Sequence, residues 1–391
     1  GALGGMARPH EQTEFAGINA VPQGCYAIAK DGIVRIYSYW DWEMPTADEM
    51  AHDVRSEIEI VEEFRNVLID SVQQRLVADV EVASYLSGGI DSCAVLGLAQ
   101  QAMDHPIRAF TLTFDNPLYD EAAIAEKQAK FVGASHHPIP ITGRDIADAY
   151  GDALWHSETQ MFNGHGVAKY LLSKAVRDAG IKVVFTGEGA DEVLGGYPFF
   201  RVDAVKHNPA LNQAQKSAFF TEILGANEAS RAIMLPSEVN TPSIEAVRRR
   251  LGWVPTSVHT MEAMSNGLAP FFSDDYAAYI DGYSPIVAAL DRLPIAQRMT
   301  GRDHLNQALY LNSKTSLPNF ILTYLGDRME MAHSIEGRVP FLDHRVAEVT
   351  ARIPAEMKVK GIREKHVLRE AAQDVLIPEV YEPLGLYQPD F

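Results

Sequence analysis

Two glycine-rich turns carry the residues of this chain whose types and spacing suit chemistry. The first turn, Ser87-Gly88-Gly89-Ile90-Asp91-Ser92, follows an apolar stretch typical of a buried strand and precedes an apolar helix. Main-chain N–H groups and hydroxyls meet at the positive end of that helix, where a phosphate or pyrophosphate can bind. The turn lacks the lysine of the G-x-x-x-x-G-K-[ST] pattern, which argues against the usual kinase and ATPase loop. A tight turn without a ligand is the alternative interpretation.

The second turn, residues 187–192, adds three acids after another apolar stretch. Acids at a helix start are common capping residues, so a structural role is the first expectation for Glu192. Glu188 and Asp191 stand among small residues that permit close approach of the backbone, and we interpret them as facing the mouth of the site. Asp91 and Asp191 are predicted to share Mg²⁺, which proteins bind through carboxylates plus phosphate oxygens.

Strand and helix patterns alternate between Glu57 and Thr186. Because the strands are largely apolar, this order predicts an α/β fold with a parallel sheet flanked by helices. Ligands of such sheets bind beyond the carboxyl ends of the strands, where both turns are expected. The predicted strands are Val80–Leu86, Ile107–Phe114, His137–Ile141 and Lys182–Thr186, and the predicted helices are Glu57–Leu76, Ser92–Met103, Asp120–Val132, Ile146–His156 and Val167–Ala179.

From Arg201 onward the sequence predicts a helical C-terminal region and no strand. Residues 383–391 have no helical period and are expected to form either a tail or a discontinuous remnant. The predicted helices are Leu211–Leu224, Glu245–Leu251, Asp274–Ile280, Asn306–Leu325, His344–Arg352 and Lys365–Val375.

The first 45 residues do not have the pattern of a complete domain. Two short strands, Ile18–Ile28 and Ile33–Tyr37, are predicted on either side of the turn Lys30-Asp31-Gly32. An isolated hairpin is barely stable in water, so these strands are expected to pair with something else. They either edge the following domain or belong to a domain of their own that is missing from this chain.

Charge and cysteine content argue against several kinds of partner. The chain has 34 basic and 52 acidic residues and a net charge of −18, which disfavours nucleic acid and an anionic membrane surface. Cys25 and Cys93 provide neither a disulfide framework nor zinc-ligand spacing. No run approaches the roughly 20 apolar residues that span a bilayer, and no signal-peptide pattern is present. The expected location is the cytoplasm, with no membrane partner.

Five motifs, in order along residues 57–382, resemble the synthetase domain of glutamine-dependent asparagine synthetases of the bacterial B type. The first of them resembles the pyrophosphate loop of the PP-loop ATP pyrophosphatases. The motifs are residues 87–92, residues 187–192 with Gly195-Gly196-Tyr197, Asp327-Arg328-Met329, Glu336-Gly337-Arg338-Val339-Pro340-Phe341-Leu342-Asp343 and Glu364-Lys365-His366-Val367-Leu368-Arg369-Glu370.

The resemblance implies two domains. Residues 46–391 are expected to form the ATP-binding synthetase domain. The stretch from Gly17 to Asp41 resembles the closing strands of the family's N-terminal glutaminase domain, so residues 1–45 are expected to be its remnant.

The resemblance also implies a reaction. ATP with Mg²⁺ would adenylate a small carboxylate substrate and release pyrophosphate, and ammonia, drawn from glutamine in the full-length enzyme, would then displace AMP to give an amide. Glu188 matches the family glutamate that accepts a proton from ammonia, and Lys365 matches a lysine that neutralises charge on the phosphates. By the same resemblance, pyrophosphate is held by Ser87, Gly88, Gly89, Asp91 and Ser92, adenosine is framed by the backbone around Tyr85, Leu86, Leu112, Thr186 and Gly187, and Mg²⁺ is held by Asp91 and Asp191.

The chain departs from the family pattern in two places. Position 1 is Gly where the glutaminase uses an N-terminal cysteine, so this chain is expected not to hydrolyse glutamine, and a missing first domain is the preferred explanation. Residues 163–168 differ from the segment that lines the acceptor region, which leaves aspartate open as the substrate. His165 is expected to cap a helix rather than to contact substrate. For Arg338, a structural role and contact with substrate are given equal weight.

Two other functions stay open. An amidotransferase or β-lactam-synthetase-like cyclase would adenylate a different carboxylate, such as one from a natural-product pathway. A catalytically silent relative would bind nucleotide only, although the presence of Asp91, Glu188, Asp191 and Lys365 argues against it. Assembly as a homodimer is also left open.

Overall fold

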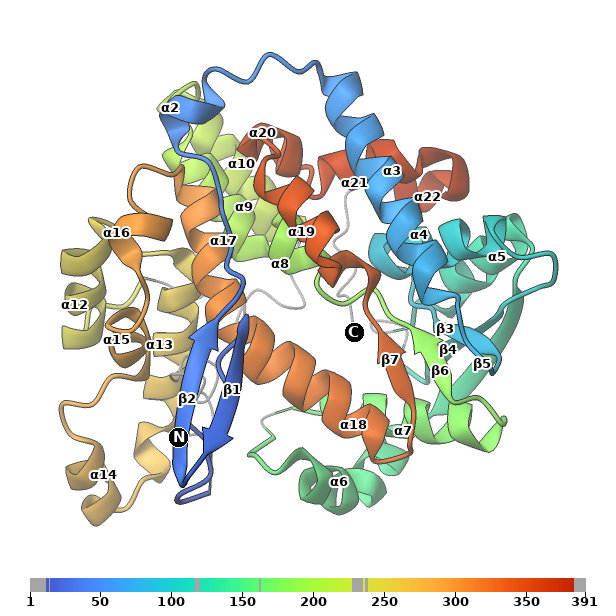
Figure 1. Cartoon of the computed structure of the whole chain (residues 1–391), viewed down its shortest axis with the longest axis horizontal. Helices are drawn as coiled ribbons and strands as arrows, with labels where there is room; N and C mark the ends of the chain where they lie inside the picture. Colours follow the sequence, from blue (N-terminus) through green and yellow to red (C-terminus); the bar gives the residue numbers. More distant parts are fainter. Residues whose placement is uncertain are drawn as a thin grey trace.

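The computed structural model describes residues 12–13, 15–116, 120–161, 163–226, 235 and 238–382. The predicted tail at residues 383–391 and the first eleven residues lie outside this range. A parallel sheet of five strands, in the order β5-β4-β3-β6-β7, forms the centre of the fold, with helices on both faces (Figure 1). The predicted α/β class is therefore confirmed. Its strands are β3 (Val82–Tyr85), β4 (Arg108–Phe114), β5 (Ser135–Ile141), β6 (Val183–Phe185) and β7 (Glu336–Arg338).

Helices alternate with the first four of these strands, as predicted. Each predicted boundary between Glu57 and Thr186 lies within three residues of the observed one. A capping box of Ser56 and Glu59 begins α3, and Gly133, at φ 81°, ends α5. These helices are α3 (Glu57–Arg75), α4 (Ile90–Gln101), α5 (Ala122–Val132), α6 (Gly143–Ser157) and α7 (His165–Asp178).

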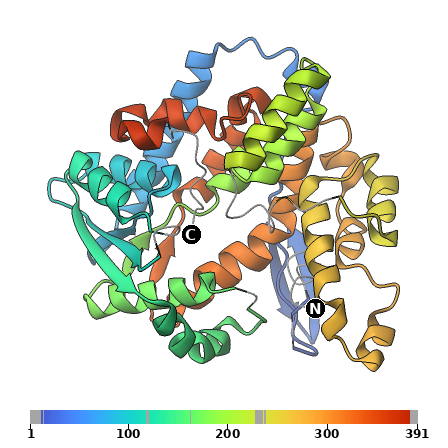
Figure 2. The same ribbon diagram turned by 180° about the vertical axis from the view of Figure 1, so that it is seen from behind.

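The two faces of the sheet bury different side chains because successive residues of a strand point in opposite directions. Ala109 and Phe185 belong to the main core, which α3, α4 and α5 complete. Ala83 and Phe110 pack on the opposite face with Leu172 of α7. Figures 1 and 2 show α4 and α5 on one side of the sheet and α6 and α7 on the other.

Strand β7 corrects the prediction that no strand follows Arg201. Its middle residue, Gly337, pairs with Val184 of β6 in parallel register. The strand has three residues, Glu-Gly-Arg, so it has no run of apolar side chains that sequence periodicity can detect. Main-chain bonds to the buried β6 hold it in place instead.

The rest of the C-terminal region is helical, as predicted. No helix in the described part of the chain is both long and apolar enough to cross a membrane. The helices are α8 (Ala190–Leu194), α9 (Pro198–His207), α10 (Gln213–Ala226), α12 (Pro242–Leu251), α13 (Thr256–Leu268), η1 (Ala269–Phe271), α14 (Asp274–Ile280), α15 (Pro285–Leu290), α16 (Ile295–Arg298), α17 (His304–Lys314), η2 (Leu317–Asp327), α18 (Arg328–Met331), η3 (Pro340–Leu342), α19 (His344–Ala351), α20 (Ala355–Lys358), α21 (His366–Ala372), η4 (Gln373–Val375) and α22 (Pro378–Tyr381), with α2 (Ala47–Met50) before α3.

The single helix predicted over Asn306–Leu325 is two helices. The α-helix α17 ends at Lys314, Thr315 leaves the helical conformation, and the π-helix η2 follows. Pro318 supplies the physical reason, because proline has no N–H to continue the α-helical hydrogen bonds. This break carries η2 toward the second glycine-rich turn.

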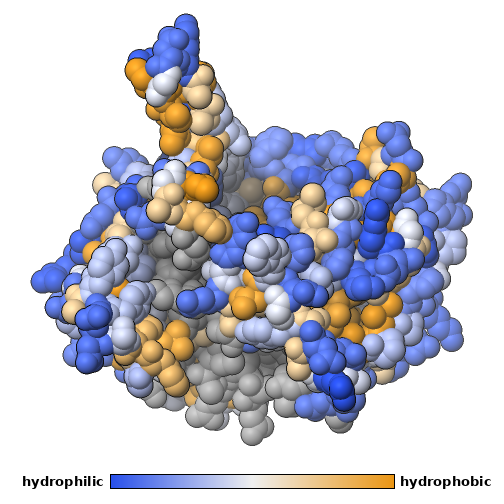
Figure 3. Space-filling view, turned by 90° about the horizontal axis from the view of Figure 1, so that it is seen from below, coloured by the Kyte–Doolittle hydropathy of each residue, from blue (hydrophilic) through white to orange (hydrophobic). Residues whose placement is uncertain are grey.

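The predicted N-terminal hairpin is present as β1 (Cys25–Lys30) and β2 (Ile33–Ser38), which pair with each other. Asp31 and Gly32 both have positive φ, as a two-residue hairpin turn requires. Neither strand joins the five-stranded sheet, so the expectation that they edge the next domain is wrong. Figure 3 shows the hairpin as a protrusion with hydrophobic and hydrophilic residues on its surface. A glutaminase domain to which it would belong stays a prediction.

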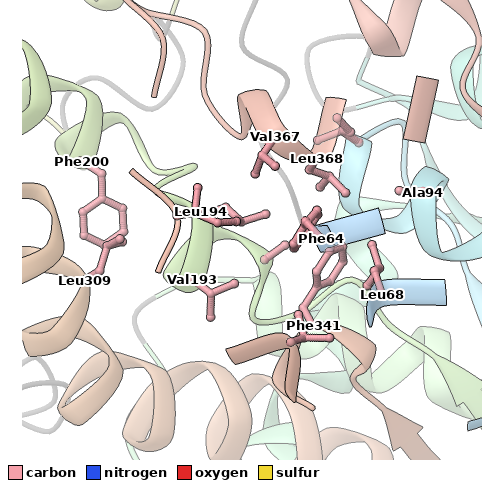
Figure 4. Packing of buried hydrophobic residues seen from close by; sticks show 14 of the residues in the cluster. Phe64, Leu68, Ala94, Val193, Leu194, Phe200, Leu309, Phe341, Val367 and Leu368 are labelled. Carbon is pink, nitrogen blue, oxygen red and sulfur yellow. The ribbon is translucent and has the colours of Figure 1, made fainter. Parts of the chain in front are cut away.

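The main core joins segments from both ends of the chain. Figure 4 shows Phe64 and Leu68 of α3 close to Phe341 of η3 and to Val367 and Leu368 of α21. All five side chains are fully buried. This packing fixes the start of α21, and therefore Lys365, over the sheet.

Helix α4 fits against the C-terminal segment only because residue 97 is a glycine. A Cβ atom built at Gly97 would lie 2.6 Å from Cβ of Val375 and 3.0 Å from its carbonyl oxygen. We therefore expect Gly97→Ala to lower the free energy of unfolding by about 1–3 kcal/mol, as overpacking of a core does. Urea unfolding measures this change.

Gly151 in α6 is the matched control, because a Cβ atom there would meet nothing within 4 Å. Gly151→Ala is expected to raise stability by about 0.5–1 kcal/mol through its higher helix propensity. Equal effects of the two substitutions would contradict the packing argument.

Candidate active site

Neighbouring strands bring the two glycine-rich turns together. Strands β3 and β6 pair directly, with Val82 opposite Val183, and the strand order reverses at this point because β4 and β5 lie on one side and β7 on the other. A Cβ atom at Gly187 would lie 2.7 Å from Cβ of Asp91 and 2.9 Å from the main-chain nitrogen of Ser92. The turns are therefore in van der Waals contact at the position where α/β sheets bind ligands.

Hydrogen bonds shape the first turn at the start of α4. The Ser87 N–H donates to Oγ of Ser92 at 3.1 Å, and the Gly89 N–H donates to Oγ of Ser87 at 3.0 Å. The Gly88 N–H donates to Oε2 of Glu121 at 2.9 Å. An anionic oxygen is thus already bound by a main-chain amide of this turn, which is the chemistry expected of a phosphate loop. Glu121 was not singled out from the sequence.

Lys365 connects the two turns through its ammonium group. Its Nζ lies 2.6 Å from Oδ2 of Asp91 and 2.8 Å from Oδ1 of Asp191, and its side chain is 2% exposed. The main chain of Lys365 has a φ of 51°, which is uncommon for residues other than glycine. Such a conformation costs of order 1–3 kcal/mol. A Cβ atom at Gly196 would lie 1.8 Å from Oδ1 of Asp191, so glycine leaves the space for this ion pair.

These two carboxylates suit Mg²⁺ in number and chemistry. Proteins bind Mg²⁺ through one or two carboxylates and leave its other positions to phosphate oxygens and water. Asp91 and Asp191 already converge on one cation, the Lys365 ammonium. Among the residues that the structure describes, no group of three or more His, Cys, Asp or Glu side chains could hold a metal. The magnesium assignment therefore rests on these two carboxylates and stays a prediction.

Glu188, in the second turn, pairs with a lysine that the sequence analysis missed. Nζ of Lys169 donates to Oε1 of Glu188 at 2.8 Å and lies 3.0 Å from Oε1 of Glu330. The same ammonium lies 4.5 Å from the centre of the Tyr85 ring. A usable signal existed, because Lys169 is three residues before Leu172 and so lies on the apolar side of α7.

Burial and nearby charges together shift the pKa values of these groups. Burial lowers the pKa of Lys169, but the charges of Glu188 and Glu330 outweigh it, and the net pKa lies above the ordinary lysine value. Burial raises the pKa of Glu330 above its ordinary range. Burial and the charge of Glu188 also raise the pKa of Asp327. The lysine therefore stays positively charged among carboxylates.

A pocket of about 160 Å³ lies between the turns. Lys365 does not line the pocket, because its ammonium group is engaged by the carboxylates of Asp91 and Asp191. The other predicted residues that do not line it are Leu86, Gly88, Gly89 and Leu112. The predicted residues that line it are Tyr85, Ser87, Asp91, Ser92, Thr186, Gly187, Glu188 and Asp191, and the others are His165, Lys169, Gly189, Glu192, Tyr197, Ile321 and Leu325. A larger hollow, of about 570 Å³, lies at the base of the hairpin and contains no residue of either turn.

Comparison with known proteins identifies the family of this chain. The asparagine synthase family matches residues 63–382, which include both turns and Lys365. The chain belongs to the asparagine synthase family. The resemblance to the family's synthetase domain is therefore confirmed.

Relatives within the asparagine synthase family carry two kinds of name. Amidase chyE of Penicillium rubens is 34% identical and amidase chry2 of Gibberella zeae is 32% identical, and each match covers 96% of this chain and 58% of the relative. Asparagine synthetase [glutamine-hydrolyzing] 1 of Bacillus subtilis is 26% identical over 95% of this chain and 55% of its own length. The chain thus spans little more than half the length of these family members.

Three of the residues predicted to frame adenosine, Tyr85, Leu86 and Leu112, pack in or against the core clusters. Leu86 is buried, and its N–H donates to the carbonyl oxygen of Phe110 at 2.8 Å. The Tyr85 hydroxyl lies 2.9 Å from Oγ of Ser173, and Leu112 packs against the core cluster that contains Tyr85. Tyr85, Thr186 and Gly187 line the pocket, whereas Leu86 and Leu112 do not. The contact with adenosine, which the prediction assigned to the backbone around these residues, stays a prediction.

The roles left open for Arg338 and His165 can be compared with their positions in the structure. Arg338 donates to Oε1 of Glu336 at 2.7 Å and to the carbonyl oxygen of Val77 at 3.0 Å, which gives it a structural role in holding β7. The helix-capping role expected of His165 is wrong, because Gly164 occupies the N-cap and the His165 side chain lines the pocket.

Glu192 is expected to make the stability of the protein depend on pH. Burial and the nearby charge of Asp191 raise its pKa to about 8, against an ordinary value of 4.5, while the Tyr197 hydroxyl donates to its Oε1 at 2.7 Å. The folded protein therefore binds this proton more tightly than the unfolded chain, and its stability falls as pH rises from about 4.5 to about 8.

We expect Glu192→Gln to remove this loss. The free energy of unfolding of the variant, relative to the original protein, should increase across that pH window and level off above it. Urea unfolding at several pH values measures the difference. A difference that does not change with pH would contradict the assignment.

Proposed function

We propose that this chain is the synthetase part of an ATP-dependent, amide-forming ligase. It adenylates a carboxylic acid, releases pyrophosphate and then joins ammonia to the acyl group. The observation that carries the proposal is the contact of Lys365 with Asp91 and Asp191 at the meeting point of the two turns. Membership of the asparagine synthase family supports amide formation as the outcome.

The first turn receives the pyrophosphate that leaves ATP. The start of α4 has the positive end of the helix dipole, and the hydroxyls of Ser87 and Ser92 lie 3.0 Å apart beside it. Mg²⁺ held by Asp91 and Asp191 would supply charge neutralisation for the phosphates. Lys365 adds a buried positive charge, which stabilises negative charge more strongly than a solvated lysine does.

Glu188 acts as the general base for amide formation. As the nitrogen of ammonia bonds to the acyl carbon, the bond from that carbon to the phosphate oxygen breaks and AMP leaves. The proton that the nitrogen loses passes to the Glu188 carboxylate, which lines the pocket. Atoms and charge balance without another reactant.

The proposed nitrogen source differs between the full-length enzyme and this chain. Glutamine, hydrolysed by an N-terminal glutaminase domain, is the proposed donor, and free ammonia would serve this chain alone. Two predictions accompany this proposal. One is a domain boundary between residues 45 and 46, and the other is a cytoplasmic location.

A carboxylate other than aspartate is the second candidate substrate. Among the described residues that line the pocket, Lys169 is the only lysine or arginine, and two carboxylates of the protein already engage it. A second carboxylate on the substrate would meet this acidic group of side chains, whereas Ile321 and Leu325 offer apolar contact. The higher identity to relatives named amidases, 34% against 26%, also favours this candidate.

Substitution of Glu188 separates the two half-reactions. We expect Glu188→Gln to leave pyrophosphate release nearly intact and to slow amide formation by about 100-fold or more, because the amide side chain cannot accept the proton. Measurement of pyrophosphate and amide in the same reaction tests this. Unchanged amide formation would remove Glu188 from the mechanism.

A panel of acids identifies the substrate. Pyrophosphate release from ATP and Mg²⁺ with ammonium is expected to depend on the acid added, with apolar monocarboxylic acids favoured over aspartate. Dependence on aspartate would select asparagine formation instead. No release with any acid would favour the silent nucleotide-binding alternative, and ammonia release from amides without ATP would contradict a ligase.

A further inference from the structure

We propose that Lys169, anchored by Glu330, is a positioning residue that holds Glu188 in place for proton transfer. This inference rests on the proposed function, in which Glu188 is the general base. It assigns a role to Lys169 and Glu330, two residues that lie outside the five family motifs.

Lys169 reaches Glu188 from a different element. It lies in α7, on the face of the sheet opposite α4, and its side chain is 15% exposed. Nζ donates to Oε1 of Glu188 at 2.8 Å and lies over the Tyr85 ring at 4.5 Å. A lysine has three N–H donors, so it can hold this oxygen and a second acceptor at once.

Glu330 is the second carboxylate that forms an ion pair with Lys169, and the fold makes room for it. Its Oε1 lies 3.0 Å from Nζ of Lys169, and its side chain is 3% exposed. A Cβ atom at Gly337 would lie 2.0 Å from Oε2 of Glu330, so glycine in β7 leaves the space for the carboxylate. Burial of an ion pair is costly and seldom increases stability over apolar packing, which favours a role beyond folding.

The arrangement gives the two oxygens of Glu188 different surroundings. Oε1 is held by Lys169, whereas Oε2 faces the end of η2, where a Cβ atom at Gly326 would lie 3.1 Å from it. The geometry assigns proton transfer to Oε2. Lys169 thus fixes the direction in which the base points, and a base must lie within hydrogen-bond reach of its proton.

Negative charge would move Glu188 if the lysine were absent. The ionisable groups around it are Lys169 from α7, Tyr85 from β3, Asp327 from η2 and Glu330 from α18. Together with Glu188 these make five groups, of which three are carboxylates, and Lys169 is the cation among them. Its removal would leave like charges that repel one another, so Glu188 would lose its fixed orientation.

The test compares four proteins in one assay. The original protein, Lys169→Met, Lys169→Met combined with Glu330→Gln, and Lys174→Met are given ATP, Mg²⁺, ammonium and the acid that the original protein uses. Pyrophosphate and amide are measured in the same reaction, and thermal unfolding is measured separately. Lys174 is the matched control because it lies in α7 but is exposed and pairs with Asp178.

We expect Lys169→Met to keep pyrophosphate release within about threefold and to lose at least about tenfold in amide formed per pyrophosphate. The double variant should regain thermal stability, because the unpaired carboxylate is removed, but not the amide ratio. Lys174→Met should match the original protein in both.

Three results would overturn the inference. These are an unchanged amide ratio in Lys169→Met, an equal loss of pyrophosphate and amide, and a double variant that recovers the ratio together with stability. An original protein that forms no amide from any acid overturns the proposed function as well. That outcome is distinct from an active protein whose Lys169 variants are also fully active.

Discussion

The candidate site depends on one buried interaction, the ammonium of Lys365 between the carboxylates of Asp91 and Asp191. Each carboxylate belongs to a different glycine-rich turn, so the lysine fixes the distance between the turns. Two such carboxylates would repel each other without a cation, and removal of one member of a buried ion pair costs about 3–5 kcal/mol in proteins. Gly187 and Gly196 are required because any side chain at these positions would occupy the space of the interaction.

The core explains how a lysine near the end of the chain reaches turns in its first half. Helix α21 begins directly after Lys365 and packs its Val367 and Leu368 against α3, which precedes the sheet (Figure 4). Apolar burial of this kind stabilises the fold at about 25 cal/mol per Å². It offsets the conformational cost of Lys365, whose positive φ persists because the surrounding packing holds it. The helical C-terminal region therefore completes the site.

A second buried lysine gives the site two cationic centres with different surroundings. Lys365 lies with the phosphate-binding turn, and Lys169 lies with Glu188 and Glu330 on the side of α7 and η2. In the proposed reaction the first centre lies beside the carboxylate of the turn that receives the pyrophosphate, and the second holds Glu188, the base that meets the attacking nitrogen. Charged groups held in advance at each place need no rearrangement during the reaction, which is the main advantage of a preorganised active site.

The sequence by itself determined the α/β class and the two turns at the carboxyl ends of strands, since apolar periodicity and glycine placement are local signals. That these two strands are neighbours was decided by the tertiary structure. The sequence also led to Lys365, because the residue stands within a motif. Strand β7, the break between α17 and η2, and the separation of the hairpin from the five-stranded sheet required the tertiary structure, because each depends on main-chain pairing or on a proline rather than on a repeating pattern. Only the tertiary structure brought Lys169, Glu121 and Glu330 to the turns. These side chains come from elements far apart in the sequence. Helix periodicity places Lys169 on the apolar side of α7, but no spacing in a single sequence reveals the partners of these three residues.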